Sequence, residues 1–127
     1  MYFSKSKYTG FWKCPKITWL EKYKPEEKEI DEDALGRMEK GNAVGDLAMG
    51  LFGDFTEVTT ISEDGKLDLD EMKRKTAECI DKGVENICEA SFDYNGLYCA
   101  VDILRKENGG YAIYEVKSST KLKYYYL

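Results

Sequence analysis

The sequence predicts one α+β domain, residues 1–127, in which N-terminal helices precede an antiparallel β-meander. Apolar residues recur at helical spacing in the first two thirds of the chain. Three β-rich runs follow, near residues 85–92, 97–105 and 111–117. Asn108-Gly109 separates the last two runs, and this dipeptide is a strong hairpin signal. Helices followed by strands are typical of α+β domains, and this length is enough for one real core.

The first helices are expected directly after the N-terminus. Ser4 is suited to cap a helix that carries Tyr8, Phe11 and Trp12 at helical spacing. Pro15 then breaks or restarts the helix, because proline cannot continue the hydrogen-bond ladder.

A long amphipathic helix is predicted over residues 32–52, after a polar linker. We expect its three glycines to allow close backbone approach, since glycine within a helix costs stability; they are Gly36, Gly41 and Gly45. Residues 57–61 predict a short strand, and a further helix begins near Leu69 and can end at Gly83.

The composition indicates a globular protein, with 43% hydrophobic and 34% charged residues. No apolar run approaches the roughly 20 residues that a membrane span needs. The N-terminus also lacks the pattern of a signal peptide. We therefore expect a cytoplasmic protein without a membrane partner.

The net charge of -5 is unevenly distributed. Residues 1–24 contain six lysines and one acidic residue, whereas the middle of the chain is acidic and its end is again basic. Such runs usually form solvated surface, but they also leave open a local basic path for nucleic acid.

The chain contains four cysteines and no histidine. Cys79, Cys88 and Cys99 are expected to be free thiols in the core, because their spacing is not that of a zinc site. Without histidine, Ser-His and Cys-His nucleophiles are excluded. Any catalysis must depend on carboxylates, lysine, tyrosine or a metal ion.

The predicted hairpin brings charged residues together. A two-residue turn at Asn108-Gly109 places Asp102 directly opposite Glu115. Because alternate side chains share a face, Lys117 joins them on that face. The opposite face is predicted to carry the apolar residues Val101, Ile103, Tyr114 and Val116.

Two opposed carboxylates repel each other, so the sheet needs a compensating charge. A hard divalent cation such as Mg²⁺ or Mn²⁺ is one solution, since carboxylates and water complete its coordination shell. A cross-strand salt bridge, with Lys117 satisfying both Asp102 and Glu115, is the other. The spacing leaves both interpretations open.

The segments "AVDIL" and "YEVKSS" resemble the core of the PD-(D/E)XK nuclease superfamily, in which an Asp on one strand precedes a (D/E)-x-K triplet on the next. The chain is similar in particular to the RecB-like branch, which includes nuclease domains of recombination helicases, small CRISPR-associated exonucleases and an uncharacterised bacterial group. The segments "SKSKYTGFWKCPKITW", "GNAVGDLAMGLF" and "EASF" extend the resemblance over nearly the whole chain.

The resemblance implies a restriction-endonuclease-like core and metal-dependent hydrolysis of DNA. Asp102 and Glu115 would bind Mg²⁺ or Mn²⁺, and Lys117 would lie next to the attacking water. Glu89 in "EASF" would be a further ligand or a supporting acid. The implied partners are DNA and another protein domain or subunit.

Three departures from the family pattern bear on these expectations. Many relatives carry a metal-binding His on the Gly-containing helix, where Asn42 is the nearest polar residue here. The family usually continues after the triplet, so we expect the chain, which stops at Leu127, to lack the C-terminal part of the domain. Cys14 matches the first iron–sulfur ligand of some relatives, but without a downstream trio we expect no cluster in this chain.

Two alternatives remain open. The chain can be a catalytically inactive module with the same fold that binds nucleic acid or assists assembly. It can also be a structural fragment that associates through the terminal "YYYL".

Overall fold

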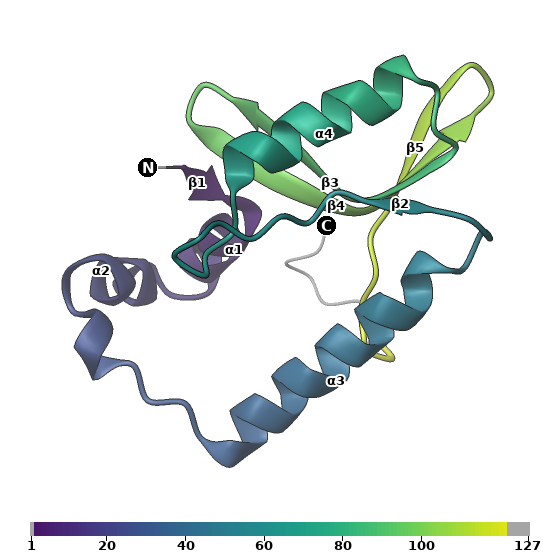
Figure 1. Ribbon diagram of the computed structural model, residues 1–127. Coiled ribbons are helices and arrows are strands. Elements are labelled where there is room, and N and C mark those ends of the chain that lie inside the picture. Colours follow the sequence, from purple (N-terminus) through teal and green to yellow (C-terminus); the bar gives the residue numbers. More distant parts are fainter. Residues whose placement is uncertain (1, 122–127) are drawn as a thin grey trace.

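The computed structural model describes residues 2–121, and it confirms an α+β fold of helices and a mixed five-stranded sheet (Figure 1). The helices are α1 (Lys5–Lys13), α2 (Pro15–Tyr23), a 3₁₀ turn (Pro25–Glu27), α3 (Glu32–Met49) and α4 (Leu69–Asp81). The strands are β1 (Phe3–Ser4), β2 (Thr56–Glu57), β3 (Asn86–Tyr94), β4 (Leu97–Glu107) and β5 (Gly110–Tyr114). Within residues 2–121, no helix has the length and apolar character needed to cross a membrane.

The expected antiparallel meander is formed by β3, β4 and β5. Two short strands extend it in parallel, β1, which was not predicted, beside β4, and β2 beside β3. The predicted strand over residues 57–61 is therefore mostly wrong, since β2 covers only Thr56–Glu57. Strand β1 leaves no signal in the sequence, because two residues show no periodicity.

Strand β4 has three neighbours, and two of them share one edge. At its start Leu97–Tyr98 pair with β1, and at its end Ile103–Glu107 pair with β5. Residues 99–102 lie between these stretches and pair with neither strand. We call this interval the β1–β5 gap.

Both hairpin turns of the meander have the backbone that Asn-Gly favours. Asn108 and Gly109 have φ angles of 48° and 80°, and Asn95 and Gly96 have 48° and 81°. Positive φ at both positions is the type I′ geometry. The predicted register is confirmed from the Glu107–Gly110 pair to the Ile103–Tyr114 pair.

Helix α4 covers one face of the sheet and supplies the hydrophobic core. Met72, Thr76 and Cys79 are buried, and their spacing of three and four positions places them on one face of the helix. They belong to the core together with Val58, which follows β2, and the strand residues Ile87, Ala90, Val101 and Leu104. The predicted end of α4 at Gly83 is confirmed, because the helix stops at Asp81 and Gly83 has a φ of 69°.

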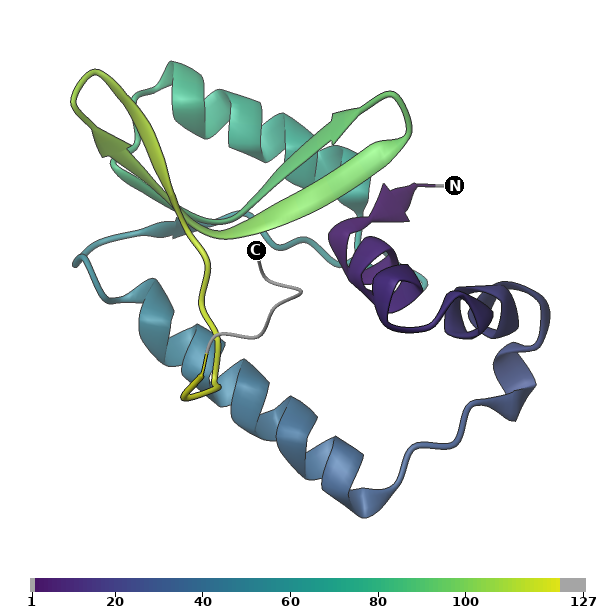
Figure 2. The ribbon, with the colours of Figure 1, turned by 180° about the vertical axis from the view of Figure 1, so that it is seen from behind.

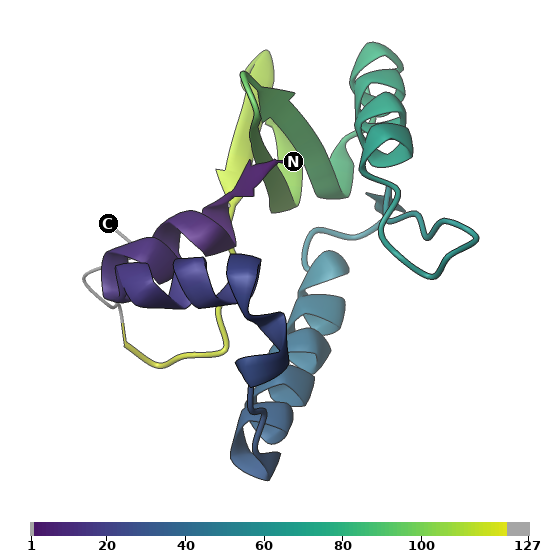
Figure 3. The same ribbon diagram turned by 90° about the vertical axis from the view of Figure 1, so that its left-hand side faces the viewer.

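Helices α1, α2 and α3 contain no buried residue. As expected, the Ser4 side chain caps α1, accepting a hydrogen bond from the backbone N–H of Lys7 at 3.3 Å, and α2 begins at Pro15. Figures 2 and 3 show α3 extending away from the sheet, beside the segment that follows β5. Its last residue, Met49, reaches the sheet, and its carbonyl accepts a weak hydrogen bond from the Cys88 thiol.

The α3 glycines do not make the close approach that we predicted. A Cβ atom at Gly36, Gly41 or Gly45 would meet nothing within 4 Å. Helix α3 also ends at Met49 and not at residue 52, with Gly50 as its C-cap.

Candidate functional site

The carboxyl ends of β1 and β5 meet at the β1–β5 gap. Because β1 runs parallel and β5 antiparallel to β4, the two strands approach the gap from opposite directions. Lys5 directly follows β1, and Glu115 directly follows β5. The Lys5 Nζ lies 2.6 Å from Glu115 Oε1, so an ion pair closes the gap between residues 110 positions apart.

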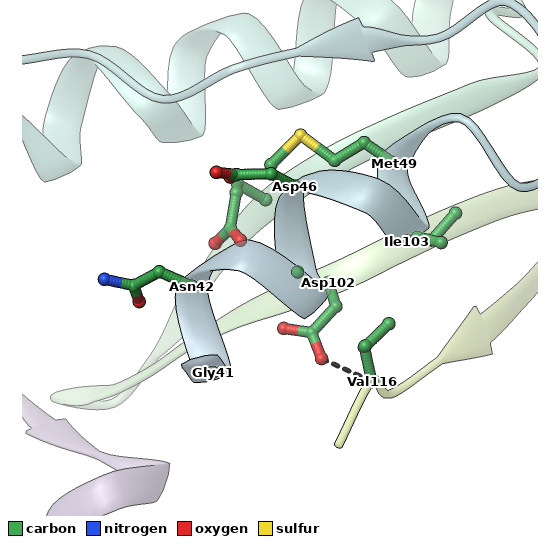
Figure 4. A pocket seen from close by; sticks show the side chains of 9 residues that line it. Gly41, Asn42, Asp46, Met49, Asp102, Ile103 and Val116 are labelled. Atoms are coloured by element: carbon green, nitrogen blue, oxygen red, sulfur yellow. Dashed lines mark hydrogen bonds between the residues drawn. The ribbon is translucent and has the colours of Figure 1, made fainter. Parts of the chain in front are cut away.

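Asp102 occupies the gap on β4 and holds the chain that leaves β5. Its Oδ2 accepts a hydrogen bond of 2.5 Å from the backbone N–H of Val116 (Figure 4). We predicted a strand as far as residue 117 with Asp102 directly opposite Glu115. That extension is wrong, because β5 ends at Tyr114 and the Asp102 carboxylate takes the place of a ladder partner.

A pocket of about 240 Å³ lies between α3 and the gap. We call it the acidic pocket, because four polar side chains line it, those of Asn42, Asp46, Glu89 and Asp102. The remaining lining residues are Gly41, Gly45, Met49, Ile103 and Val116. The missing side chains of Gly41 and Gly45 therefore leave open space in this pocket. They do not serve the close approach of another backbone segment.

Three of the four polar pocket residues were singled out from the sequence. Asn42, Glu89 and Asp102 were predicted as site residues, and the structure brings them together. Asp46 was missed, although it follows Asn42 by four positions and so shares its helix face. That spacing within "NAVGD" is the signal that could have identified it.

Glu89 has an unusual backbone, with a φ of 59° within β3. A non-glycine residue in this region costs about 1–3 kcal/mol, and such residues cluster at functional sites. The register of β3 and β4 places Glu89 opposite Asp102, since Cys88 pairs with Ile103 and Ala90 with Val101.

This local distortion changes which side chains share a face. Ala90 and Val101 belong to the core beneath α4. Ile103 and Val116 line the acidic pocket together with Asp102. Our expectation that Ile103 and Val116 lie on the face opposite Asp102 is therefore wrong, because alternation fails at this point of the sheet.

Glu89 lies in a negative electrostatic environment. Burial raises the pKa of its carboxyl above the ordinary value, and the charge of Asp102 adds to the rise. Glu57 and Glu115 contribute in the same direction, while Lys5 opposes them. The carboxylates around the acidic pocket are thus close enough to repel one another.

Glu115 is directed towards lysines, and it does not line the acidic pocket. Its Oε1 contacts the ammonium groups of both Lys5 and Lys117. Burial acts to raise the pKa of Glu115, but the hydrogen bonds from Lys117 and Lys5 outweigh it and hold the pKa below its ordinary value. The sequence left open a bound cation or a salt bridge for Glu115, and in the structure Glu115 forms the salt bridge.

The oxygen ligands of the acidic pocket fit a hard divalent cation by their chemistry. Carboxylate and amide oxygens are what Mg²⁺ and Mn²⁺ prefer. Among residues 2–121, however, no group of three or more His, Cys, Asp or Glu side chains is already arranged to hold a metal ion. Glu115 would have to leave its lysines to complete such a group with Glu89 and Asp102.

The cysteines lie outside the acidic pocket, and all four are free thiols. Cys14 is half-buried between α1 and α2, and Cys99 is half-buried in β4. Cys79 and Cys88 are buried, as expected, and burial raises the pKa of Cys88 to about 11. The terminal "YYYL" lies outside the described residues.

Comparison of the chain with known protein families, with curated proteins and with solved structures finds no match.

Proposed function

We propose that this chain is a metal-dependent nuclease that hydrolyses phosphodiester bonds in DNA. The observation that carries the proposal is the acidic pocket, where Glu89 and Asp102 meet Asn42 and Asp46 of α3. Val116 also lines the pocket, so its neighbours Glu115 and Lys117 flank this carboxylate cluster. Glu89, Asp102, Glu115 and Lys117 also carry the resemblance to the RecB-like nucleases.

The pocket acids would hold Mg²⁺ or Mn²⁺ through Asp102 and Glu89, with Asn42 or Asp46 contributing from α3. Glu115 would join them as a ligand by turning from its lysines towards the pocket. When bound, such an ion lowers the pKa of a coordinated water and stabilises charge on a phosphate. The raised pKa of Glu89 supports this assignment, since carboxylates that repel each other gain most from a cation.

The lysines at the pocket rim would act on the phosphate. Lys5 and Lys117 both contact Glu115, so one carboxylate holds two ammonium groups at the β1–β5 gap. If Glu115 turns towards the pocket, these ammonium groups face an incoming phosphate and stabilise the charge that develops on it. Lys117 would also orient the attacking water, while Asp102 keeps the segment after β5 in place.

Titration of Mn²⁺ by calorimetry tests the proposal. The parent protein should bind Mn²⁺, and both Asp102→Asn and Glu115→Gln should weaken binding at least tenfold. Asparagine retains an acceptor for the Val116 N–H, so this variant removes charge without removing the hydrogen bond. The matched control is Glu63→Gln, which removes an exposed carboxylate away from the pocket.

Cleavage of labelled DNA then separates binding from chemistry. We expect Lys117→Ala to keep Mn²⁺ binding and to lower the cleavage rate about a hundredfold, the usual loss for one charge-stabilising donor. Cleavage that persists undiminished in both Asp102→Asn and Lys117→Ala would refute the assignment.

A second candidate is an inactive module that binds nucleic acid or assists assembly. The observation that favours it is Glu115, which two lysines already engage. In that case the parent would neither bind Mn²⁺ nor cleave, and Glu115→Gln would leave salt-sensitive DNA binding unchanged.

A further inference from the structure

The Lys5–Glu115 ion pair draws a carboxylate away from the acidic pocket. Glu115 follows β5 directly, and the next residue, Val116, lines the pocket. The Glu115 side chain therefore starts beside the pocket wall, yet its Oε1 lies 2.6 Å from the Nζ of Lys5. Within the described part of the chain, no group of three or more His, Cys, Asp or Glu side chains is arranged for a metal ion. The acid that would complete such a group is the one that Lys5 holds.

The backbone that carries Lys5 is anchored to the sheet. Strand β1 pairs with the start of β4, and the N–H of Phe3 donates a hydrogen bond of 2.8 Å to the carbonyl of Gly96. One residue earlier, the hydroxyl of Tyr2 accepts a hydrogen bond of 2.8 Å from the Nζ of Lys73 on α4. Lys5 thus reaches the β1–β5 gap from a fixed position, and its backbone does not belong to the segment that carries Glu115.

Lys117 differs from Lys5 in this respect. It contacts the same Oε1 of Glu115, but it lies two residues further along the same segment and can move with that segment. A Glu115 side chain that turns towards the acidic pocket would leave Lys5 behind. The Lys5 contact is therefore the one that must break.

The charge of Lys5 also acts on the pocket acids. Burial and then the charge of Asp102 raise the pKa of the Glu89 carboxyl, whereas Lys5 acts to lower it. A positive charge at this place supplies part of what a bound cation would supply, because both relieve the repulsion between neighbouring carboxylates. Lys5 and a divalent cation are thus alternatives for the same negative charge.

We propose that Lys5 is a positioning residue that keeps Glu115 out of the metal site and so competes with the divalent cation. Glu115 becomes a ligand only after the Lys5–Glu115 pair breaks. The apparent affinity for the metal is therefore lowered by the small fraction of molecules in which the pair is open. The inference rests on the proposed function, since it concerns the same site, and it adds a contact that holds this site in a form that binds metal weakly.

Calorimetric titration of Mn²⁺ into Lys5→Gln tests the inference. The two side chains of the pair are 48% and 36% exposed. We expect Lys5→Gln to bind Mn²⁺ about fivefold more tightly than the parent, the upper scale for one partly exposed ion pair. A residue that only supports the fold would leave the affinity unchanged or lower it. Circular dichroism of each variant verifies folding.

Two further variants separate the ion pair from a general loss of charge. Lys5→Arg should bind Mn²⁺ within about twofold of the parent, because a guanidinium also pairs with a carboxylate. Lys16→Gln is the matched control, since it removes an equal charge from an exposed position on α2. It should leave the Mn²⁺ affinity unchanged.

A double-mutant cycle separates competition for Glu115 from simple repulsion between Lys5 and the cation. Repulsion persists when Glu115 is replaced by glutamine, whereas competition needs the Glu115 carboxylate. We therefore expect the double variant Lys5→Gln/Glu115→Gln to bind Mn²⁺ no more tightly than Glu115→Gln alone.

The possible outcomes distinguish the inference from the proposed function. Mn²⁺ binding by the parent that is unchanged or weaker in Lys5→Gln would overturn the role of Lys5 and leave the metal site in place. Equal tightening in the Glu115→Gln background would also overturn it, because repulsion alone would then explain the gain. Binding that appears only in Lys5→Gln would support both the site and the competition. If neither protein binds Mn²⁺, the proposed function fails together with the inference.

Discussion

The α4 side and the α3 side of the sheet differ in where they place apolar side chains. All buried side chains among residues 2–121 lie between Val58 and Leu104, in or next to α4, β3 and β4. Helix α3 buries none, and Leu47 within it is 81% exposed. Nevertheless, α3 supplies Asn42 and Asp46 to the acidic pocket. Stability and candidate chemistry therefore belong to different regions, and they meet at Glu89 and Asp102.

Truncations in the two regions should have very different effects on stability. Ile87→Ala removes a side chain that is 0% exposed, and we expect a loss of about 2–5 kcal/mol in the free energy of unfolding. Leu47→Ala should change it by less than about 0.5 kcal/mol, as exposed substitutions usually do. Urea denaturation of both variants measures the difference. Equal losses would mean that α3 is packed as tightly as the α4 side.

At Glu89, fold stability and metal binding favour different side chains. Glu89→Gly should stabilise the fold by about 1 kcal/mol, because glycine adopts positive φ without the cost that glutamate pays. It should also weaken Mn²⁺ binding. Glu89→Ala removes the same carboxylate but keeps the unfavourable backbone, so the difference in unfolding free energy between the two variants isolates the strain. A glycine variant no more stable than the alanine variant would show that the backbone here is not strained.

The α3 glycines provide a matched pair within one helix. Gly36→Ala and Gly45→Ala should each stabilise the protein by about 0.5–1 kcal/mol, since alanine is the better helix former and no atom within 4 Å opposes the added methyl group. Of these two glycines, Gly45 lines the acidic pocket and Gly36 does not. We therefore expect Gly45→Ala to reduce Mn²⁺-dependent cleavage severalfold and Gly36→Ala to leave it unchanged. Thermal melting and a cleavage assay on the same samples measure both effects.

The sequence is a good guide where local interactions decide the structure. The Asn108-Gly109 turn and the register from Glu107 to Ile103 follow from the φ angles that the turn requires. The spacing of Met72, Thr76 and Cys79 predicts the buried face of α4, because residues three or four positions apart share one face of a helix.

Features that depend on distant segments could not be predicted in this way. The Lys5–Glu115 ion pair joins residues 110 positions apart, and nothing near either residue signals it. The end of β5 at Tyr114 depends on Asp102, which binds the Val116 N–H in place of a strand partner. The grouping of Asn42, Glu89 and Asp102 came from a family resemblance, and Asp46 was missed because that resemblance emphasised other positions.

The smallest expected effect concerns the exposed ion pairs of α4. Removing one of them tests whether surface charge contributes to the stability of the α4 side. Lys82 and then Arg74 lower the pKa of Glu78 below its ordinary value of 4.5. A carboxyl whose pKa is lowered by folding stabilises the protein above its unfolded pKa, and this contribution is lost as the pH falls through the lower folded value. The urea midpoint of the parent should therefore fall slightly more between about pH 6 and pH 3 than that of Glu78→Gln.

Because the pair is exposed, high salt should remove most of the difference. An unchanged difference in high salt would mean that Glu78 acts through packing, and the contrast between the two regions would then rest on buried side chains alone.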